Sequence, residues 1–423
     1  MGKTSRISGF HKLTVEERLK IVSEFAGLSD DEAALLKKRG HLDIQTADRM
    51  IENVIGTFEL PLGIAANMII NGKEYLIPMA VEESSVVAGV TNAARIARSG
   101  GGFFTSNTGP LMIAQIQAVD VKDPFGAKLR LYEKKDEILR IANEQDPILV
   151  KIGGGAKNIE VRVIETAFGQ MVIVHLIVDT RDAMGANAVN TMAETLAPYV
   201  GEWTGGRVYL RILSNLADRR LVRARVRVKK EEFKGAEDVL EGMIYAWAFA
   251  DADPYRAATH NKGIMNGISA MVIATGNDFR AIEAGAHAYA SRTGRYRSLT
   301  HWEKDQNGDL IGTIEVPMAV GLVGGATKMH PISGVVIKIL GVKTATELGE
   351  IIGAVGLCQN LAALRALAAE GIQKGHMSLH AKNIAVSAGA TGDLIDVIAK
   401  RMVEEGTIRM DRAQELLKEL KKG

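Results

Sequence analysis

The chain contains 423 residues, of which 47% are hydrophobic and 24% charged, and its formal net charge is +2. A chain of this length is too long to form one compact core, so we predict two or three domains. The composition excludes disordered, collagen-like and disulfide-framed proteins. The balance of 52 basic against 50 acidic residues gives no general attraction to nucleic acid or to anionic lipid.

The single cysteine and the N-terminal segment indicate the cellular compartment. Cys358 alone permits no intrachain disulfide and no thiolate metal cluster, which fits a reducing cytoplasm, and we interpret it as a small buried hydrophobe. The first residues, MGKTSRISGFHKL, lack the apolar core of a signal peptide. The most apolar run that we identify, Met171–Val178, is interrupted by His175 and is far shorter than the roughly 20 residues that span a bilayer. We therefore expect a cytoplasmic protein with no membrane anchor.

Apolar residues recur at helical spacing between residues 14 and 59 and predict two or three helices. The dipeptide Asn71-Gly72 then lies between two apolar runs and predicts a β-hairpin. Beyond it, residues 84–98 are rich in alanine and valine and end at Gly100-Gly101-Gly102. This pattern predicts a helix that stops at glycine.

A block of different texture begins after Gly109-Pro110. It alternates strand patterns with helical patterns and predicts an α+β unit. No strand in it is followed by the G-x-G-x-x-G spacing of a Rossmann turn, so a nucleotide domain here would have another design. The expected strands are 111–121, 159–166, 170–179 and 208–213, and the expected helices are 131–143 and 183–199.

After Ser214 the chain returns to long helical patterns rich in alanine and glycine. Before them, basic and apolar residues alternate through Arg219–Lys230, which predicts a half-buried strand with a solvated basic face. We expect the segments before Gly109 and after Ser214 to form one domain into which the smaller unit is inserted. The expected helices are 236–252, 262–274, 278–292, 344–370 and, in the C-terminal tail, 392–422.

Polar residues gather at one place in otherwise small or apolar sequence. Residues 253–267 contain Arg256, His260, Asn261, Lys262 and Asn266, and Asp278 follows the next apolar stretch. A lysine beside an apolar helix is usually a surface residue whose stem packs on the protein. Here, however, lysine, arginine and aspartate in apolar surroundings must pair with one another or bind an anion. The density of these groups favours a functional site.

Two adjacent acids, Glu82 and Glu83, begin an apolar helix. Helix capping explains one acid at this position but does not require two. A buried glutamate beside a lysine that shares its proton suits general acid catalysis.

Three other motifs indicate less. Gly153-Gly154-Gly155 lacks the spacing of a phosphate loop, so we interpret it as a β-turn. His376 and His380 lie four residues apart but lack the glutamate of H-E-x-x-H and a third ligand. We expect no metal site there and interpret one histidine as a proton donor.

RNA binding by Arg219–Lys230 is a weak alternative because no aromatic residues are interleaved with the charges.

Eight segments taken together resemble hydroxymethylglutaryl-coenzyme A (HMG-CoA) reductases nearly end to end. In the amino-acid sequences of these segments and in its lack of a membrane anchor, the chain resembles the soluble bacterial and archaeal class II enzymes rather than the anchored eukaryotic class. The segments are RISGFHKL from Arg6, ENVIG from Glu52, PMAVEESSVVA from Pro78, DAMGANAVNTM from Asp182, SNLADRR from Ser214, DPYRAATHNKGIMNG from Asp253, ATGNDFRAIEAGAHAYA from Ala274 and GHMSLHAKN from Gly375.

The resemblance implies an α+β fold of three parts. Residues 1–108 and 220–371 would form a large, mostly helical domain for acyl-CoA binding and dimerisation. Residues 109–219 would form an inserted, small, non-Rossmann (ferredoxin-like) α/β domain for NAD(P), and residues 372–423 a mobile C-terminal flap. It also implies a homodimer with active sites at the subunit interface and allows a higher oligomer.

The implied reaction interconverts HMG-CoA with mevalonate and CoA by two hydride transfers, through a hemithioacetal and an aldehyde, without a metal. Lys262 would stabilise the carbonyl oxygen, Glu83 would supply a proton, and Asp278 would lie hydrogen-bonded between them. His376 would protonate the departing CoA thiolate, with His380 as the fallback. The sequence leaves the physiological direction open. The alternative is a non-catalytic acyl-CoA or nucleotide sensor, against which the joint presence of these catalytic types argues.

Further positions match the family's substrate and cofactor contacts. Asp146 matches the position that discriminates between the two nicotinamide cofactors, because a carboxylate there accepts from ribose hydroxyls and repels a 2′-phosphate. NADH is therefore the expected cofactor, with NADPH possible. The substrate positions are Arg256, Ser85, Asn266 and Gln359, and the other cofactor positions are Asp182, Met184, Gly185, Asn187 and Asn215.

Overall fold

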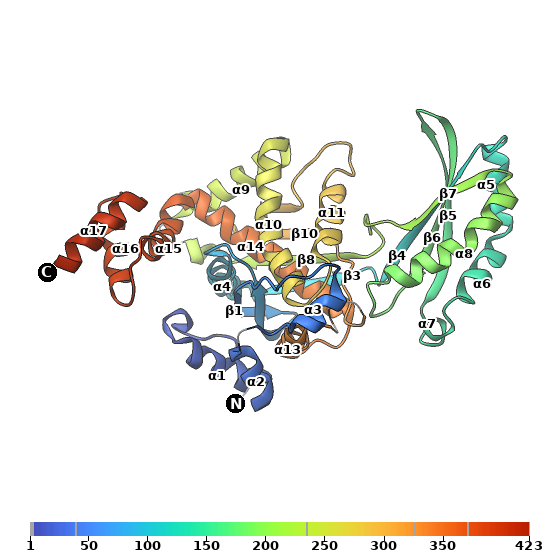
Figure 1. The fold of residues 1–423 in the computed structure, drawn as a ribbon. Coiled ribbons are helices and arrows are strands. Elements are labelled where there is room, and N and C mark those ends of the chain that lie inside the picture. The colour runs from blue at the N-terminus through green and yellow to red at the C-terminus, as the bar shows by residue number, and fades with distance from the viewer. Residues whose placement is uncertain are drawn as a thin grey trace.

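The computed structural model describes residues 4–38, 40–233, 236–324, 327, 329–369 and 372–422; the side chains of 372–379 and 421–422 are outside the described part. Two β-sheets and a set of long helices build the molecule (Figure 1). The chain is α+β, as predicted. The four-stranded sheet and the C-terminal helices lie at opposite ends of the larger central part.

The central part contains a six-stranded mixed sheet in the order β2-β1-β3-β8-β10-β9. β1 pairs antiparallel with β2 and parallel with β3, and the remaining neighbours are antiparallel. The expected turn joins β1 to β2, because Asn71 and Gly72 both have positive φ angles, 50° and 76°. The strands are β1 (Leu62–Ile70), β2 (Lys73–Ala80), β3 (Phe103–Asn107), β8 (Leu221–Val228), β9 (Thr300–Lys304) and β10 (Leu310–Pro317).

The longest helix, α14 (Ala345–Ala369), is the core helix of this part. It packs against β8, where Gly349 and Gly353 let the helix approach the side chain of Val222. Among the described residues it is the one helix long and apolar enough to cross a membrane, and 67% of its apolar window is buried inside the protein. The apolar run at Met171–Val178 is shorter than this window and forms part of a β-strand.

The other helices of the central part surround this sheet and α14. They are α1 (Val15–Ala26), α2 (Asp30–Lys37), α3 (Ile44–Met50), α4 (Val86–Ala97), α9 (Glu237–Ala252), α10 (Pro254–Ala274), α11 (Phe279–Ala290) and α13 (Pro331–Leu340), with short 3₁₀ turns η1 (Phe10–Lys12), η2 (Arg98–Gly100) and η3 (Lys230–Phe233). α4 and α10 both contact α14, so three helices meet where the polar segments of the sequence converge.

The block after Gly109 forms a separate antiparallel sheet in the order β5-β6-β4-β7. Its elements are β4 (Leu111–Val119), α5 (Pro124–Glu133), α6 (Lys135–Asn143), α7 (Pro147–Lys151), β5 (Gly155–Thr166), β6 (Gly169–Asp179), α8 (Ala186–Thr204) and β7 (Arg207–Leu213). Figure 1 shows α5, α6 and α8 lying along one side of this sheet.

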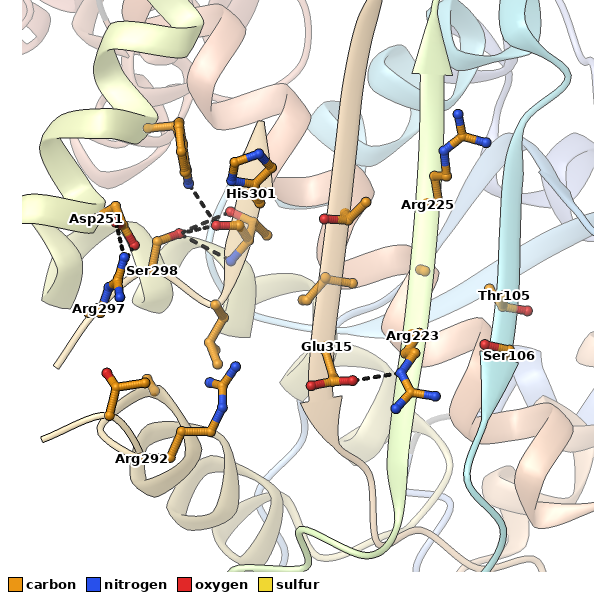
Figure 2. Close-up of a pocket in the computed structure, with 18 of the residues that line it drawn as sticks. Thr105, Ser106, Arg223, Arg225, Asp251, Arg292, Arg297, Ser298, His301 and Glu315 are labelled. Carbon is orange, nitrogen blue, oxygen red and sulfur yellow. Dashed lines mark hydrogen bonds and ion pairs between the residues drawn. The ribbon is translucent and has the colours of Figure 1, made fainter. Parts of the chain in front are cut away.

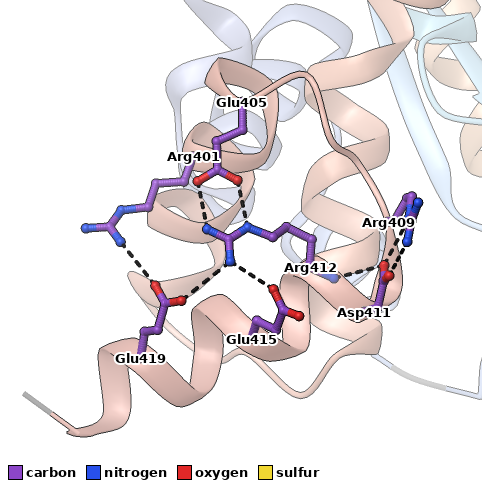
Figure 3. A network of polar contacts seen from close by, with 7 residues as sticks. All are labelled: Arg401, Glu405, Arg409, Asp411, Arg412, Glu415 and Glu419. Carbon is purple, nitrogen blue, oxygen red and sulfur yellow. Dashed lines mark hydrogen bonds and ion pairs between the residues drawn. The ribbon is translucent and has the colours of Figure 1, made fainter.

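Three helices end the chain: α15 (Ile372–Ser387), α16 (Leu394–Glu404) and α17 (Met410–Lys422). They enclose a small apolar core of their own, which includes Ala385, Ile398 and Leu416. Arg412 also joins the elements, since its guanidinium donates to Glu405 at 2.7 Å and to Glu415 at 2.9 Å (Figure 3). These contacts make the C-terminal helices a unit distinct from the main core.

Most expected elements are present, with three differences. The helix expected at 131–143 is two helices, α5 and α6, and the tail expected to be helical over 392–422 is divided into α16 and α17. β3, β9, β10 and α13 were not predicted. The half-buried strand with a basic outer face is confirmed as β8, in which Arg223 and Arg225 are exposed and Val222, Ala224 and Val226 are buried.

Candidate active site

Glu83 and Lys262 are 179 residues apart in sequence and meet between α4 and α10. Lys262 Nζ donates to Glu83 Oε2 at 2.7 Å, and Asn266 Nδ2 lies 3.4 Å from the same oxygen. Lys262 and Asn266 are four residues apart on α10, so both project from one side of the helix. The predicted pairing of a glutamate with a lysine is present.

The turn between β2 and α4 determines where Glu83 lies. Ser85 begins α4 with a φ of 76°, a left-handed conformation that residues other than glycine adopt rarely. Such a conformation costs on the order of 1 kcal/mol or more and persists only where the surrounding structure enforces it, often at functional sites. Glu83 consequently lies beside the positive N-terminal end of α4, which favours negative charge there.

Gln359 reaches toward the same place from α14. It is 8% exposed, and its Oε1 has no hydrogen-bond partner among the described residues. Glycines on the two neighbouring helices leave room for the Gln359 side chain. A Cβ at Gly267 of α10 would lie 2.9 Å from the Gln359 Cβ, and a Cβ at Gly89 of α4 would lie 3.6 Å from the Gln359 Nε2. A buried amide oxygen without a partner fits the expected substrate contact, because a ligand hydroxyl would satisfy it.

The Glu83–Lys262 pair is open to solvent within one chain. The Lys262 side chain is 60% exposed and the Glu83 side chain 38%. The expectation of a buried glutamate is therefore not met by this chain alone. Substrate or a second subunit would have to supply the desolvation that strengthens their electrostatic effect.

Asp278 does not lie between Lys262 and Glu83. Its carboxylate begins α11, where it accepts from the N–H groups of Arg280 and Ala281 at 3.0 and 3.1 Å and contacts the Arg280 guanidinium at 3.2 Å. Partial burial acts to raise the pKa of Asp278, but the Ala281 N–H and Arg280 hold it below the ordinary value.

The geometry of α10 explains this separation. Lys262 lies twelve residues before the end of α10 at Ala274, which corresponds to about 18 Å of helix. The turn that follows stays bonded to the last turn of α10, with Asn277 N donating to Val272 O at 2.9 Å. Asp278 is thus held at the far end of the helix, and the expected hydrogen bonds within one chain are absent among the described contacts.

Arg256 and the two histidines lie on α10 and α15. Arg256 is in the first turn of α10, half-buried, and its guanidinium makes no hydrogen bond or ion pair with another described residue. Burial holds its pKa below the ordinary value. His376 and His380 both lie on α15, where His380 is exposed and the side chain of His376 lies outside the described part.

Most of the predicted cofactor positions lie near the N-terminus of α8. Gly185 precedes this helix with a φ of 97° and gives it no side-chain cap, so the first N–H groups remain available to an anion. Met184 precedes Gly185, and Asn187 lies exposed in the first turn. Asn215 lies exposed where the chain leaves β7.

Two acidic cofactor positions have structural contacts of their own. Asp182 Oδ1 accepts the N–H of Ala345 at 2.8 Å, which joins the turn before α8 to the start of α14. Asp146 caps α7 by accepting from Leu149 N at 2.9 Å. Beside Asp146 is an open cavity of about 480 Å³, lined by residues that include Asn143 and Pro147.

A cavity of about 800 Å³ lies elsewhere, between β3, β8, β10, α9 and α11 (Figure 2). Arg223, Arg225, Arg292 and Arg297 line it, and neither Glu83 nor Lys262 does. Two of these arginines are paired within the chain: Arg223 donates to Glu315 at 2.6 Å and Arg297 to Asp251 at 3.1 Å.

Among the described residues no group of three His, Cys, Asp or Glu side chains is arranged to hold a metal. Cys358 is fully buried, as predicted.

A family model described as hydroxymethylglutaryl-coenzyme A reductase matches residues 14–381. The chain belongs to this family. It is 62% identical to the 3-hydroxy-3-methylglutaryl-coenzyme A reductase of Archaeoglobus fulgidus over 418 residues, which are 99% of this chain and 95% of the relative. A probable reductase of Borreliella burgdorferi is 38% identical over 79% of this chain and 77% of its own length.

Solved structures of the class II reductase from Streptococcus pneumoniae are also similar. One, bound to NADPH in open conformations, has a TM-score of 0.82 and 41% identity and covers 97% of this chain and 100% of its own. A second has a TM-score of 0.84 and covers 98% of this chain and 99% of its own. The chain is an HMG-CoA reductase by family and therefore an NAD(P)-dependent oxidoreductase, and nothing in these similarities supports a non-catalytic sensor.

Proposed function

We propose that this reductase converts HMG-CoA to mevalonate and CoA, or the reverse, with Glu83, Lys262, Asp278 and His376 as catalytic residues. The observation that carries the proposal is the Lys262 Nζ to Glu83 Oε2 contact of 2.7 Å at the open junction of α4 and α10. Asn266, Gln359, Arg256 and Ser85 surround the same junction and would hold the acyl group.

The chemistry needs positive charge where the thioester carbonyl becomes an oxyanion. Hydride for this carbonyl carbon would come from a reduced nicotinamide held by the cofactor unit. The Lys262 ammonium donates to the oxygen as negative charge develops, an effect that is strongest once water is excluded. Glu83 returns a proton through the contact it already makes with Lys262. Arg256, with no ion-pair partner among the described residues, is free to bind the terminal carboxylate of the acyl group.

Release of CoA leaves a thiolate that must be protonated. His376 lies on α15, in the C-terminal unit that follows α14. We propose that this unit closes over the site as a flap and brings the imidazole to the sulfur. His380, one helical turn later, is the fallback donor.

A second copy of the chain would complete the site. Asp278 lies beyond the end of α10, which is about 18 Å of helix away from Lys262 in the same chain, so we infer that it reaches a Lys262–Glu83 pair across a subunit interface. Exposed aromatic side chains beside α10 support such a contact: Tyr245 is 75% exposed and Tyr255 87% exposed. We propose a homodimer, which allows further assembly, with one active site at each end of the shared surface.

The cofactor would bind the unit of residues 109–219. The uncapped N-terminus of α8 at Gly185 fits a diphosphate, with Met184, Asn187, Asp182 and Asn215 nearby. Asp146 uses one carboxylate oxygen to cap α7, which leaves the other for a ribose hydroxyl. We propose NADH as the preferred cofactor because this carboxylate repels a 2′-phosphate, although the similar Streptococcus pneumoniae structure holds NADPH.

The domain organisation proposed for this function has three parts. Residues 1–108 and 220–371 form the acyl-CoA and dimerisation domain, 109–219 the cofactor domain, and 372–423 the flap. The two sheets and the separate apolar core of the C-terminal helices support this division. We place the protein in the cytoplasm, in agreement with its single reduced cysteine, Cys358.

Absorbance of the reduced nicotinamide tests this function directly. We expect the purified protein to oxidise NADH when HMG-CoA is added, with a higher kcat/KM than for NADPH. Lys262→Ala should lower kcat by about 10³-fold because it removes the group that stabilises the oxyanion. Its melting temperature should change little, since Lys262 is mostly exposed. Unchanged kcat in Lys262→Ala would contradict the assigned role.

A further inference from the structure

Arg220 lies where the chain returns from the four-stranded sheet to the six-stranded sheet. It directly precedes β8, and its backbone carbonyl accepts the N–H of Met318 at 2.9 Å. The connection that leads from β3 to the four-stranded sheet lies beside Arg220. In this connection Thr108 Oγ1 donates to Arg219 O and accepts from Leu221 N, each at 2.8 Å. The two connections between the sheets are therefore fastened together at this residue.

The side chain of Arg220 is almost fully buried, with 4% of the residue exposed. Burial lowers the pKa of its guanidinium to about 10, and nearby Asp179 and Asp182 partly oppose this effect. A buried cation is expensive unless hydrogen bonds compensate the lost hydration. The partners of Arg220 therefore indicate why an arginine is kept at this position.

The partners of Arg220 lie in two places: the turn before α8, beside the four-stranded sheet, and the loop after β10, beside the six-stranded sheet. Nη1 donates to Thr180 Oγ1 at 3.0 Å and lies 3.1 Å from the carbonyl oxygen of Ala183 and 3.4 Å from that of Met184. Nη2 donates to the carbonyl oxygen of Val320, in the loop after β10. One guanidinium thus joins the turn that leads into α8 to the large part of the molecule.

Other contacts dock the same turn on the same loop. The carbonyl of Asp182 accepts the N–H of Leu322 at 2.8 Å, and its carboxylate accepts the N–H of Ala345. A Cβ at Gly321 would lie 2.5 Å from Met184 N, so the two backbones pack without room for a side chain. The orientation of this turn sets where the uncapped N-terminus of α8 points.

We propose that Arg220 is a positioning residue that fixes the N-terminus of α8, and with it the nicotinamide nucleotide, relative to the large part of its own chain and so to the active site which that nucleotide serves. The inference rests on the proposed function, because it assigns the nucleotide diphosphate to that helix terminus. Arg220 does not touch the nucleotide. It acts through the carbonyl groups of Ala183 and Met184, which it holds immediately before Gly185.

A lysine cannot replace this arginine fully. The planar guanidinium places donors on opposite sides and reaches Thr180 and Val320 at once, whereas an ammonium is a single point of donation. Arg220→Lys keeps the charge and tests the bridging geometry alone. Thr180→Val removes the hydroxyl that accepts from Arg220 and that itself donates to Ala183 O at 3.0 Å, with little change of shape, and so tests the same turn from its other side.

The test measures nucleotide and acyl-CoA kinetics on the full-length protein. We expect Arg220→Lys to raise the KM and Kd for NADH or NADPH about tenfold and to lower kcat, since a hydrogen-bonded charged group typically contributes a factor of this order. Thr180→Val should shift the nucleotide constants in the same direction by about threefold. The KM for HMG-CoA should stay within about twofold in both variants, because α4 and α10 are untouched.

Arg98 provides a matched control. It is another largely buried arginine, 19% exposed, that donates to Glu74 and to the carbonyl oxygen of Asn67 inside the large part. Arg98→Lys should lower the melting temperature but leave the nucleotide KM unchanged. If wild-type protein oxidises neither nucleotide, the proposed function fails. If wild-type is active and Arg220→Lys and Thr180→Val keep wild-type nucleotide constants, the positioning role is overturned.

Discussion

At the scale of single residues, the polar groups around α10 divide into those that do chemistry and those that hold the fold. His260 belongs to the second group although it lies two residues before Lys262. It is 3% exposed, and its Nε2 lies 2.9 Å from Thr300 Oγ1 and from Ser298 Oγ. Burial, reinforced by the nearby charge of Arg256, lowers the pKa of His260 to about 3.

This shift predicts a pH-dependent loss of stability. The unfolded chain protonates this histidine below its ordinary pKa of 6.5, whereas the folded protein does so only near 3. Stability is therefore present above pH 6.5 and is lost as the pH falls from there toward 3. The contribution of His260 to this loss is about 2 kcal/mol between pH 7 and pH 5.

Urea unfolding of wild-type and His260→Gln protein at both pH values measures this contribution. The variant should be less stable at pH 7 but should lose about 2 kcal/mol less on acidification. Other histidines with lowered pKa values, His175 and His330, titrate in both proteins and cancel in the comparison. Equal losses in the two proteins would show that His260 does not titrate as described.

At the scale of elements, close backbone packing positions the strands and helices. Gly312 of β10 lies opposite Trp302 of β9, and a methyl group at Gly312 would overlap the indole ring. Trp302 is fully buried, and its Nε1 donates to Asn360 of α14 at 2.8 Å. This cross-strand pair joins the edge of the six-stranded sheet to the core helix.

Two glycine substitutions should have opposite effects. Gly312→Ala should destabilise the protein by about 1–3 kcal/mol because Trp302 must move out of its position. Gly334, exposed inside α13 with nothing near its Cβ position, is the control. Gly334→Ala should stabilise the protein by up to about 1 kcal/mol, because alanine has less freedom to lose on folding. Thermal unfolding of both variants tests the pair, and a neutral Gly312→Ala would contradict the packing described.

Local patterns predicted much of this architecture. The Asn71-Gly72 hairpin, the helix ending near Gly100 and the alternation along β8 all depend on neighbouring residues, so the sequence is sufficient to predict them. The hairpin of β9 and β10 was missed although Asn307-Gly308 lies between these strands and is the same turn signal. Pro331 and Gly341 likewise bound α13 as start and stop residues that were not used.

Contacts between residues that are far apart in the sequence were harder to predict. The meeting of Glu83 with Lys262 was proposed from chemistry and is present, whereas the described contacts of Asp278 within one chain do not include this pair. Sequence proximity to Lys262 conceals the length of the helix between them. The role of Arg220 as a bridge was also not visible, because its partners lie up to 100 residues away and are mostly backbone carbonyls.

At the scale of the whole molecule, the site is divided between distant regions. Figure 1 shows the four-stranded sheet and the C-terminal helices at opposite ends of the molecule. A single chain in this arrangement does not bring α15 to the cofactor positions at α8. The proposed dimer resolves this separation, since the partner would bring its own Asp278 and cofactor unit to the Lys262–Glu83 pair.

Hybrid dimers test this sharing. Lys262→Ala and Asp278→Ala chains carrying different tags are coexpressed, and the mixed dimer is purified through both tags. If the residues act across the interface, one of its two sites is intact, and the mixed dimer should have about half of the wild-type kcat. If both residues act within one chain, each site of the mixed dimer is defective and the protein should be inactive.

The central claim is that one site carries out two successive reductions. The most direct measurement is the number of nicotinamide molecules oxidised per CoA thiol released, determined by absorbance and a thiol reagent in the same reaction. We predict a ratio of two, with mevalonate as the product and with both signals lost together in Lys262→Ala. A ratio of one with accumulation of the aldehyde, or thiol release without oxidation, would contradict the account.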